Sequence, residues 1–392
     1  MKYNIIVEKK VRCFKTTQEY IFRRSSYLLF LLIATLLWSC QNKTFEWDPG
    51  ISAPANYPAG GPSIVYYYKG NPIAHASSGT AILSSWGGSG GGFMSGENKK
   101  VVPDSVSVTW DCAIDEVIYK GGSKLPYNAM LQLFRKGYTS SDARHIHQTY
   151  DYITAALAPG GHVSIFLGAS DPEDSLDVEV FKKKKKKIGI VDTANSITLR
   201  TAKGREAKEI LQYVAVHGTP YSIWEKGEKS YHYTFGVSSQ DNDMELTLMT
   251  LYTKDGSFYQ DVGDFHNGDP DAPWLLPNTH NIVTYKRKLP IHIVPTWGDI
   301  KTEENYYMTD VVLPQNFEQQ FAKGYTNPKT GKHEAYNCFV IGIEKGGEYA
   351  QIWLSGKNAI KPIMRFKAKV KAKDSVKGTF ISGGYAEEVQ YF

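Results

Sequence analysis

The sequence predicts a mainly β protein of two tandem β-sandwich or jelly-roll-like units, related by a pseudo-two-fold axis and each carrying one short helix. Many short segments are rich in β-branched and aromatic residues, turns containing Gly or Pro separate them, and parts of the chain recur about 185–188 residues later. Short strands punctuated by turns are typical of packed sheets, and recurrence at a fixed distance is typical of a duplicated unit. The clearest strand segments are 63–68, 105–110, 163–167, 245–252 and 349–354.

The predicted helix of each unit lies in the best-preserved part of the internal repeat. The first copy runs from Leu125-Pro126 to Gly137-Tyr138, and the second from Leu313-Pro314 to Gly324-Tyr325. Proline suits the first turn of a helix, and glycine commonly ends one. Matched positions extend the repeat in both directions: Trp110 with Trp297, Tyr119 with Tyr307, His147 with His333, and Tyr150 with Tyr336.

Residues 1–39 are predicted to form a lipoprotein signal peptide. An uncharged run, 27–38, follows Arg23-Arg24 and precedes Ser39-Cys40. This run is shorter than the roughly 20 apolar residues that span a bilayer, and its flanks are those of a cleaved secretion signal. The stretch ending in Cys40 resembles the lipobox of bacterial lipoproteins, which implies that the Cys40 thiol is acylated and holds the chain on a lipid bilayer. A plain signal peptide is the alternative.

The predicted organisation after the leader is a short tether and two β domains. No acidic residue directly follows Cys40, which favours the outer membrane and its periplasmic face, with cell-surface display as the alternative. The predicted segments are a tether at 40–46, a first β domain at 47–190, a linker at 191–215, which includes a helical stretch at 201–211, and a diverged second β domain at 216–392.

The charge distribution excludes nucleic acid as the expected partner. The chain has 45 basic and 40 acidic residues, a net charge of +5, but seven basic and two acidic residues lie within 1–39. The remainder is therefore balanced in charge. Binding to nucleic acid depends on surplus positive charge that displaces counterions from phosphates, and the body of this chain has none.

The first copy resembles a known family. Residues 125–138 and the stretch from Tyr150 to Leu167, with Ala158-Pro159-Gly160-Gly161 at its centre, are similar to the pattern of DUF2931, a Gram-negative lipoprotein family of unknown function. The resemblance covers about residues 45–182, and the second copy is more diverged. It implies an envelope lipoprotein with a β-rich globular part, and it implies no activity.

The candidate binding surface is the Gly-rich stretch between Trp86 and Phe93, together with histidines of the two copies. The stretch has no Lys-Ser/Thr end and no helical run after it, so it does not predict a phosphate loop. Glycine there permits a partner to approach the main chain closely. The candidate residues are Trp86, Gly90, Phe93, His147 and His333.

Metal and cofactor signals are weak. His145 and His147 stand two residues apart, as chelating residues on one strand face would, but hydrogen-bonding loop histidines are the default interpretation. Asp261, Asp264, Asp269 and Asp271 offer carboxylate oxygens that calcium accepts, without the spacing of an EF-hand. We expect no metal, with Asp264, Asp269 and Asp271 as the weak candidates, and no cofactor.

Two further features have structural explanations. The six lysines Lys182–Lys187 follow a β-like stretch, and a solvated edge strand is favoured over contact with anionic lipid. Cys112 and Cys338 remain after the leader, each in an apolar strand-like run, so both a disulfide and two buried thiols are open.

The sequence contains no recognisable catalytic motif, including the Gly-x-Ser-x-Gly elbow of hydrolases. The favoured hypothesis is a non-enzymatic binding or structural lipoprotein, with its ligand in the cleft between the units or at the Gly-rich stretch. The alternatives are an immunity-type inhibitor of an envelope-targeting toxin, a carbohydrate-binding lipoprotein and an unrecognised hydrolase. The partners expected are a lipid bilayer, reached through Cys40, and a protein or glycan ligand.

Overall fold

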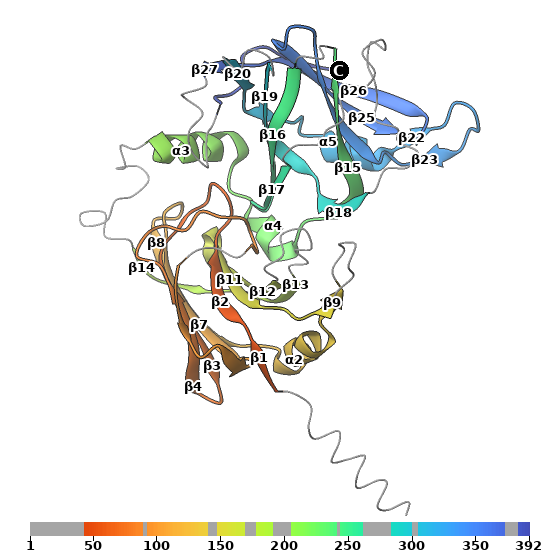
Figure 1. Ribbon diagram of the computed structural model, residues 1–392. Helices are drawn as coiled ribbons and strands as arrows, with labels where there is room; N and C mark the ends of the chain where they lie inside the picture. Colours follow the sequence, from red (N-terminus) through yellow and green to blue (C-terminus); the bar gives the residue numbers. More distant parts are fainter. Residues whose placement is uncertain are drawn as a thin grey trace, which may run out of the picture.

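The computed structural model of the protein confirms a mainly β fold (Figure 1). It describes residues 43–88, 92–139, 147–168, 178–190, 205–240, 244–261, 284–299, 305–372 and 383–392. The first unit occupies the lower half of Figure 1 and the second unit the upper half, with helix α4 between them and helix α3 at the left, beside the second unit. All five strand segments predicted above lie within strands of the structure.

The first unit contains a six-stranded and a four-stranded sheet. Their strand orders are β14-β8-β7-β3-β4-β5 and β13-β12-β11-β2, with β2 parallel to β11 and the other neighbours antiparallel. Two short pairs, β1-β6 and β9-β10, complete it. The elements are β1 (Thr44–Glu46), β2 (Asp48–Ser52), β3 (Ala59–Tyr68), β4 (Asn71–Ser77), β5 (Phe93–Gly96), β6 (Lys99–Val101), β7 (Ser105–Cys112), β8 (Val117–Lys124), α2 (Tyr127–Lys136), β9 (Tyr138–Thr139), β10 (His147–Gln148), β11 (Tyr152–Ala158), the 3-10 turn η1 (Pro159–Gly161), β12 (His162–Gly168), β13 (Val178–Lys184) and β14 (Lys186–Ile190).

The second unit contains two six-stranded sheets. Their orders are β18-β15-β24-β25-β26-β28 and β17-β16-β19-β20-β27, with β21 as a sixth strand that pairs with β19. The elements are β15 (Ser230–Ser239), β16 (Met244–Thr253), β17 (Phe258–Asp261), β18 (Tyr285–Lys288), β19 (Pro290–Asp299), β20 (Asn305–Met308), β21 (Val311–Val312), α5 (Phe317–Lys323), β22 (Tyr325–Thr326), β23 (His333–Glu334), β24 (Cys338–Ile343), β25 (Tyr349–Gly356), β26 (Ala359–Lys367), β27 (Val370–Ala372) and β28 (Val389–Tyr391).

The two units pair their strands in the same order. In one sheet of each unit, a strand that precedes the unit helix runs parallel to a strand that comes after it: β2 with β11, and β15 with β24. Two antiparallel strands continue each of these sheets. In the other sheet, the run β4-β3-β7-β8-β14 corresponds to β17-β16-β19-β20-β27. This correspondence is what a duplicated chain would produce, although the tandem origin itself stays a prediction.

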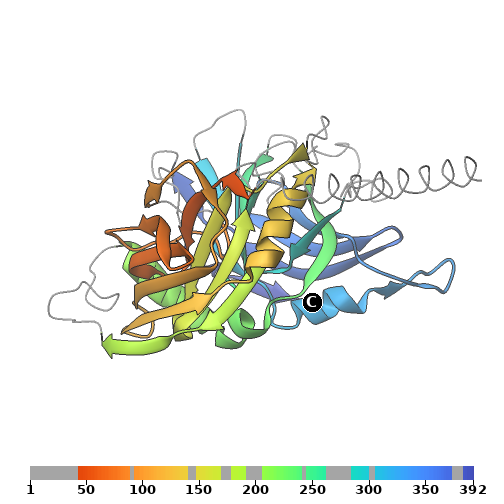
Figure 2. The same ribbon diagram turned by 90° about the horizontal axis from the view of Figure 1, so that it is seen from below.

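Alternating side chains explain how the sheets enclose their cores. Along β7 every second residue is buried, from Val106 and Val108 to Trp110 and Cys112, as expected of a strand with one apolar face. These side chains share a core with residues of β11, β12 and the buried face of α2. Helix α2 lies beside these strands when the first unit is viewed from below (Figure 2).

Glycines end both unit helices because no other residue fits there. Gly137 and Gly324 have φ of 58° and 61° with ψ of −159° and −156°. This region of backbone space is essentially restricted to glycine. A Cβ atom would stand 2.1 Å from the Gln148 carbonyl oxygen at Gly137 and 2.3 Å from the Glu334 carbonyl oxygen at Gly324.

Helices α3 (Arg205–His217) and α4 (Tyr221–Lys226) connect the units, and α4 packs on β12 and β13 of the four-stranded sheet. The strands β11 and β12 are buried along almost their whole length, because one face meets the core and the other an aromatic cluster. We call this cluster the junction cluster; it comprises Tyr57, Trp86, Ala156, Ala158, Phe166, Tyr213 and Trp224. The turn 253–258 of the second unit closes it, since the Trp224 indole N–H donates to the Asp255 carbonyl oxygen at 2.8 Å.

Several predicted boundaries and features are refined by the structure. The tether predicted at 40–46 is too long, because Thr44–Glu46 form β1 and pair with β6. The predicted linking helix lies at Arg205–His217, so the linker helix ends two residues beyond the predicted linker. Cys112 and Cys338 are buried free thiols, so the alternative of a disulfide is wrong.

The lysine run lies on sheet edges, as the favoured interpretation predicted. β13 and β14 are edge strands of different sheets, and the run passes from one to the other. Lys185, between them, is buried and donates from its Nζ to the Ser123 hydroxyl at 2.6 Å. Within the described part of the chain, no helix has the length and apolar character required to cross a membrane.

Candidate functional site

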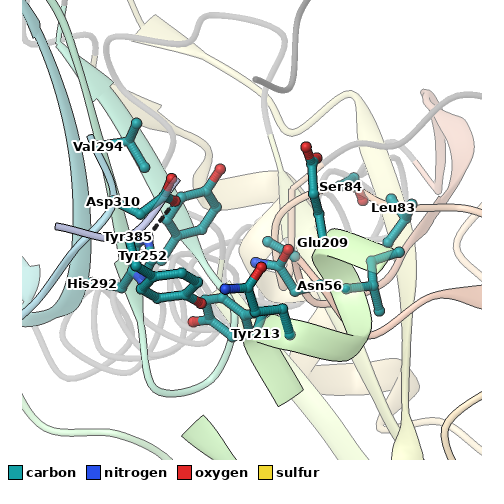
Figure 3. A pocket seen from close by; sticks show the side chains of 13 residues that line it. Asn56, Leu83, Ser84, Glu209, Tyr213, Tyr252, His292, Val294, Asp310 and Tyr385 are labelled. Carbon is teal, nitrogen blue, oxygen red and sulfur yellow. Dashed lines mark hydrogen bonds and ion pairs between the residues drawn. The ribbon is translucent and has the colours of Figure 1, made fainter. Parts of the chain in front are cut away.

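A pocket lies where the first unit, helix α3 and the second unit meet (Figure 3). We call it the junction pocket. It encloses about 720 Å³ of space, including its open mouth. Its walls come from two loops of the first unit, from α3, and from β16, β19 and the C-terminal segment of the second unit: Ala55, Asn56, Leu83, Ser84, Glu209, Ile210, Gln212, Tyr213, Tyr252, His292, Val294, Asp310 and Tyr385.

Backbone hydrogen bonds fix the two units against each other beside this pocket. The Gly256 carbonyl oxygen accepts the backbone N–H groups of Ala55 at 2.9 Å and Trp86 at 3.3 Å. Gly256 has φ of 79°, and a Cβ atom there would stand 2.4 Å from the Pro54 side chain. The close approach of the two main chains therefore depends on glycine at this turn.

A chain of three titratable side chains reaches the junction pocket, whose wall includes its second and third members, His292 and Asp310. His217 Nε2 lies 3.1 Å from His292 Nδ1, and His292 Nε2 lies 2.9 Å from Asp310 Oδ1. The other carboxylate oxygen of Asp310 accepts the Gly384 N–H at 2.8 Å. His292 and Asp310 are buried, at 1% and 6% exposure, so this polar chain is held by its internal hydrogen bonds.

Burial keeps His217 uncharged. Desolvation, followed by repulsion from His292, lowers the pKa of His217 to about 4. Its ring also packs on Tyr213 with a centroid distance of 4.3 Å, one helical turn earlier in α3. The imidazole is therefore a neutral hydrogen-bonding group near pH 7.

Three tyrosine rings surround His292 of the second unit. The centroids of Tyr213, Tyr252 and Tyr385 lie 5.4, 5.6 and 5.7 Å from that of His292. Desolvation first, and the Asp310 charge second, raise the pKa values of Tyr252 and Tyr385 well above the usual range. These phenols stay protonated, so the pocket offers flat apolar rings with neutral hydroxyls.

The predicted binding-surface residues lie apart from one another. Trp86 is 7% exposed and belongs to the junction cluster, so its indole packs between the units and is not an open surface. Phe93 is 79% exposed on the edge strand β5, and Gly90 lies outside the described residues. His147 and His333 are exposed and pack against Gly137 and Gly324 of their own units.

The remaining predicted positions are mostly beyond the described ranges. Cys40, Asp264, Asp269 and Asp271 lie outside them, as does His145. Among the described residues, no group of three or more His, Cys, Asp or Glu side chains is arranged to hold a metal ion.

The residues of the histidine–aspartate chain were missed by the sequence analysis. His217, His292 and Asp310 are widely separated in the sequence and form no recognisable motif. His217 follows the predicted linking helix, and this was the only local indication of a place at the junction. The internal repeat offered one further signal. Trp297 matches Trp110, and five residues before each tryptophan the second copy has His292 where the first copy has Ser105.

The fold and the pocket define a two-unit, mainly β protein with a polar, tyrosine-lined pocket at its junction. Residues 35–222 match the model of a family described as "Protein of unknown function (DUF2931)". This match confirms the resemblance seen in the sequence. No curated protein and no solved structure matches the chain. Tyr252, His292, Asp310 and Tyr385 lie beyond the matched range.

Proposed function

We propose that this protein is a non-enzymatic binding lipoprotein, anchored through acylated Cys40 to the periplasmic face of the outer membrane, that binds a sugar-containing ligand in the junction pocket. The observation that carries the proposal is the composition of that pocket, to which both units and α3 contribute. Small-ligand sites are commonly concave, apolar in part and supplied with a few placed polar groups.

The side chains of the junction pocket suit a sugar ring. A pyranose has an apolar face of C–H bonds, which packs on aromatic rings, and a rim of hydroxyls that donate and accept hydrogen bonds. Tyr213, Tyr252 and Tyr385 supply rings. Asn56, Gln212 and Glu209 supply amide and carboxylate groups at the pocket wall.

The proposed anchor is close to the folded part of the chain. β1 begins at Thr44, so three residues separate Cys40 from the first strand. Extended chain spans at most about 3.6 Å per residue, which holds the first unit near the bilayer surface. Acylation requires the Cys40 thiol, so a Cys40→Ala protein should leave the membrane fraction. Membrane fractionation like that of the parent protein would refute the anchor.

The ligand is tested with the soluble chain from residue 42 onward. We expect retention on a glycan resin or array, and a saturable affinity by calorimetry for the retained sugar. Tyr385→Ala and Gln212→Ala should each weaken binding about tenfold or more, which corresponds to about 1.4 kcal/mol. Gln319→Ala, on the exposed face of α5, is the matched control and should bind normally.

Two results would overturn the sugar proposal. Failure of the soluble chain to bind any glycan is the first. Recovery of one stoichiometric protein from an envelope extract, with binding unaffected by Tyr385→Ala, is the second and would favour the inhibitor hypothesis.

A further inference from the structure

A second pocket lies on the other side of His217, and we call it the amphipathic pocket. Its space, with the open mouth, amounts to about 1000 Å³. Most of its wall is apolar and comes from the end of α3, the start of β19 and the segment leading into α5: Tyr57, Val216, Pro220, Leu289, Pro290, Ile291, Val312, Leu313, Pro314 and Phe317. Leu313-Pro314 is the motif that the sequence analysis identified as repeated.

Titratable and polar side chains form the rest of the wall. His217, Glu228, Lys229, Lys254 and Glu318 line it, with Gln315 as a neutral polar neighbour. Lys254 Nζ pairs with Glu318 Oε2 at 2.6 Å, and the Tyr231 hydroxyl donates to Glu318 Oε1 at 2.9 Å. The charges of Lys254 and Glu318 therefore offset each other.

Glu228 is held by backbone groups of the neighbouring turn. Its two oxygens accept the N–H groups of Lys254 at 3.3 Å and Asp255 at 2.9 Å. Desolvation first, and repulsion from Asp255 second, raise the pKa of Glu228 to about 8.

Lys229 is the second lysine of this pocket, and its charge, with that of Lys254, lowers the pKa of Glu318. Its side chain is exposed and its ammonium lies 4.6 Å from the centroid of the Tyr231 ring. Within the part of the chain that the structure describes, Lys229 forms no ion pair. An exposed ammonium beside an apolar wall can contact the charged head of a ligand whose apolar part is buried against that wall.

We propose that the amphipathic pocket binds an anionic amphiphile, with its apolar chain against the wall formed by α3, β19 and the Leu313-Pro314 segment and its anionic head at Lys229. The carboxylate of a fatty acid and the phosphate of a single-chain lipid share this chemistry. Burial of the chain supplies most of the affinity, and Lys229 selects the charge of the head.

This site is independent of the sugar proposal. His217 lines the amphipathic pocket, whereas its hydrogen-bonded neighbour His292 lines the junction pocket. Gln212 and Tyr385 line only the junction pocket, and Val216 and Lys229 line only the amphipathic pocket. Variants of each pair therefore test one site without altering the other.

The test is calorimetry on the soluble chain from residue 42 onward, with single-chain probes below their micelle concentrations. Dodecanoate and dodecyl phosphate should bind with one saturable site, and the tighter of the two identifies the head group. Dodecyltrimethylammonium should bind at least tenfold more weakly. Lys229→Glu should weaken binding of the anionic probes at least tenfold, and Val216→Glu should do the same by placing a charge on the exposed part of the wall.

Lys323→Glu is the matched control, because it makes the same charge change on an exposed lysine of α5 outside the pocket. Circular dichroism establishes that each variant is folded. Equal affinity for the cationic probe, equal losses in Lys323→Glu and Lys229→Glu, or no saturable binding of either anionic probe would each overturn the proposal.

Discussion

The two units pair their strands in the same order, but the buried histidine and aspartate that line the junction pocket, His292 and Asp310, both belong to the second. Trp110 pairs with Tyr119 across β7 and β8, and Trp297 pairs with Tyr307 across β19 and β20. Their ring centroids are 5.1 and 5.9 Å apart. The shared residues are therefore those that build the sheets and their cores.

One difference lies at the first residues of the matched strands, β7 in the first unit and β19 in the second. His292 stands five residues before Trp297, and the position five residues before Trp110 is Ser105, whose hydroxyl donates to Asp104 at 2.7 Å. The first unit instead places aromatic and small side chains of β11 and β12 at the junction. The first unit thus supplies most of the apolar surface of the junction cluster, and the second unit supplies the buried histidine–aspartate pair of the pocket. Two sheets with the same strand order therefore contribute different side chains to the junction.

The largest effect is expected from breaking the junction itself. Trp224→Ala removes a buried indole, at 2% exposure, that contacts both units, and losses of about 3–5 kcal/mol are typical for such truncations. Chemical denaturation should show this loss in the free energy of unfolding. Lys226→Ala, exposed on the same helix, should change it little. Equal stability of the two variants would show that α4 does not hold the units together.

The two helix-ending glycines give a matched test of the shared scaffold. Gly137→Ala and Gly324→Ala each force an alanine into glycine-only backbone space and against a carbonyl oxygen. We expect each to lower the free energy of unfolding by about 3 kcal/mol. A large loss in one variant and none in the other would contradict the equivalence of the units at this position.

The smallest effect concerns pH. His217 has a folded-state pKa of about 4, below the value of about 6.5 expected in the unfolded chain. Between these values the unfolded chain binds more protons, so stability is full above pH 6.5 and falls toward pH 4, with a slope of at most about 1.4 kcal/mol per pH unit. Thermal unfolding across this range should show a shallower fall for His217→Gln than for the parent. His232→Gln, at an exposed position, should behave as the parent does.

Local patterns were sufficient to predict the strands and the unit helices. The alternation along 105–110 and 349–354 indicates a strand with one buried face, and a glycine at a helix end indicates a positive φ at that residue. Both are short-range effects, so they can be read from neighbouring residues.

The junction could not be predicted because it depends on how the units dock. Trp86 was assigned to an open surface since its glycine-rich neighbours are typical of an exposed loop, whereas a second unit covers it. His217, His292 and Asp310 come from a helix, a strand and a loop far apart in the sequence. The fold of the second unit brings His292 to Asp310, and the packing of α3 against that unit brings His217 to His292.

Trp224 lies two residues beyond the end of the family match at residue 222. A shortened chain that stopped at that border would retain β11 and β12 but lose the indole that seals their outer face. Ala156, Ala158 and Phe166 would then meet water, and such a fragment would be prone to self-association. For biochemists who wish to isolate the family unit, the practical border is therefore set in space by α4 and not by the limits of sequence similarity.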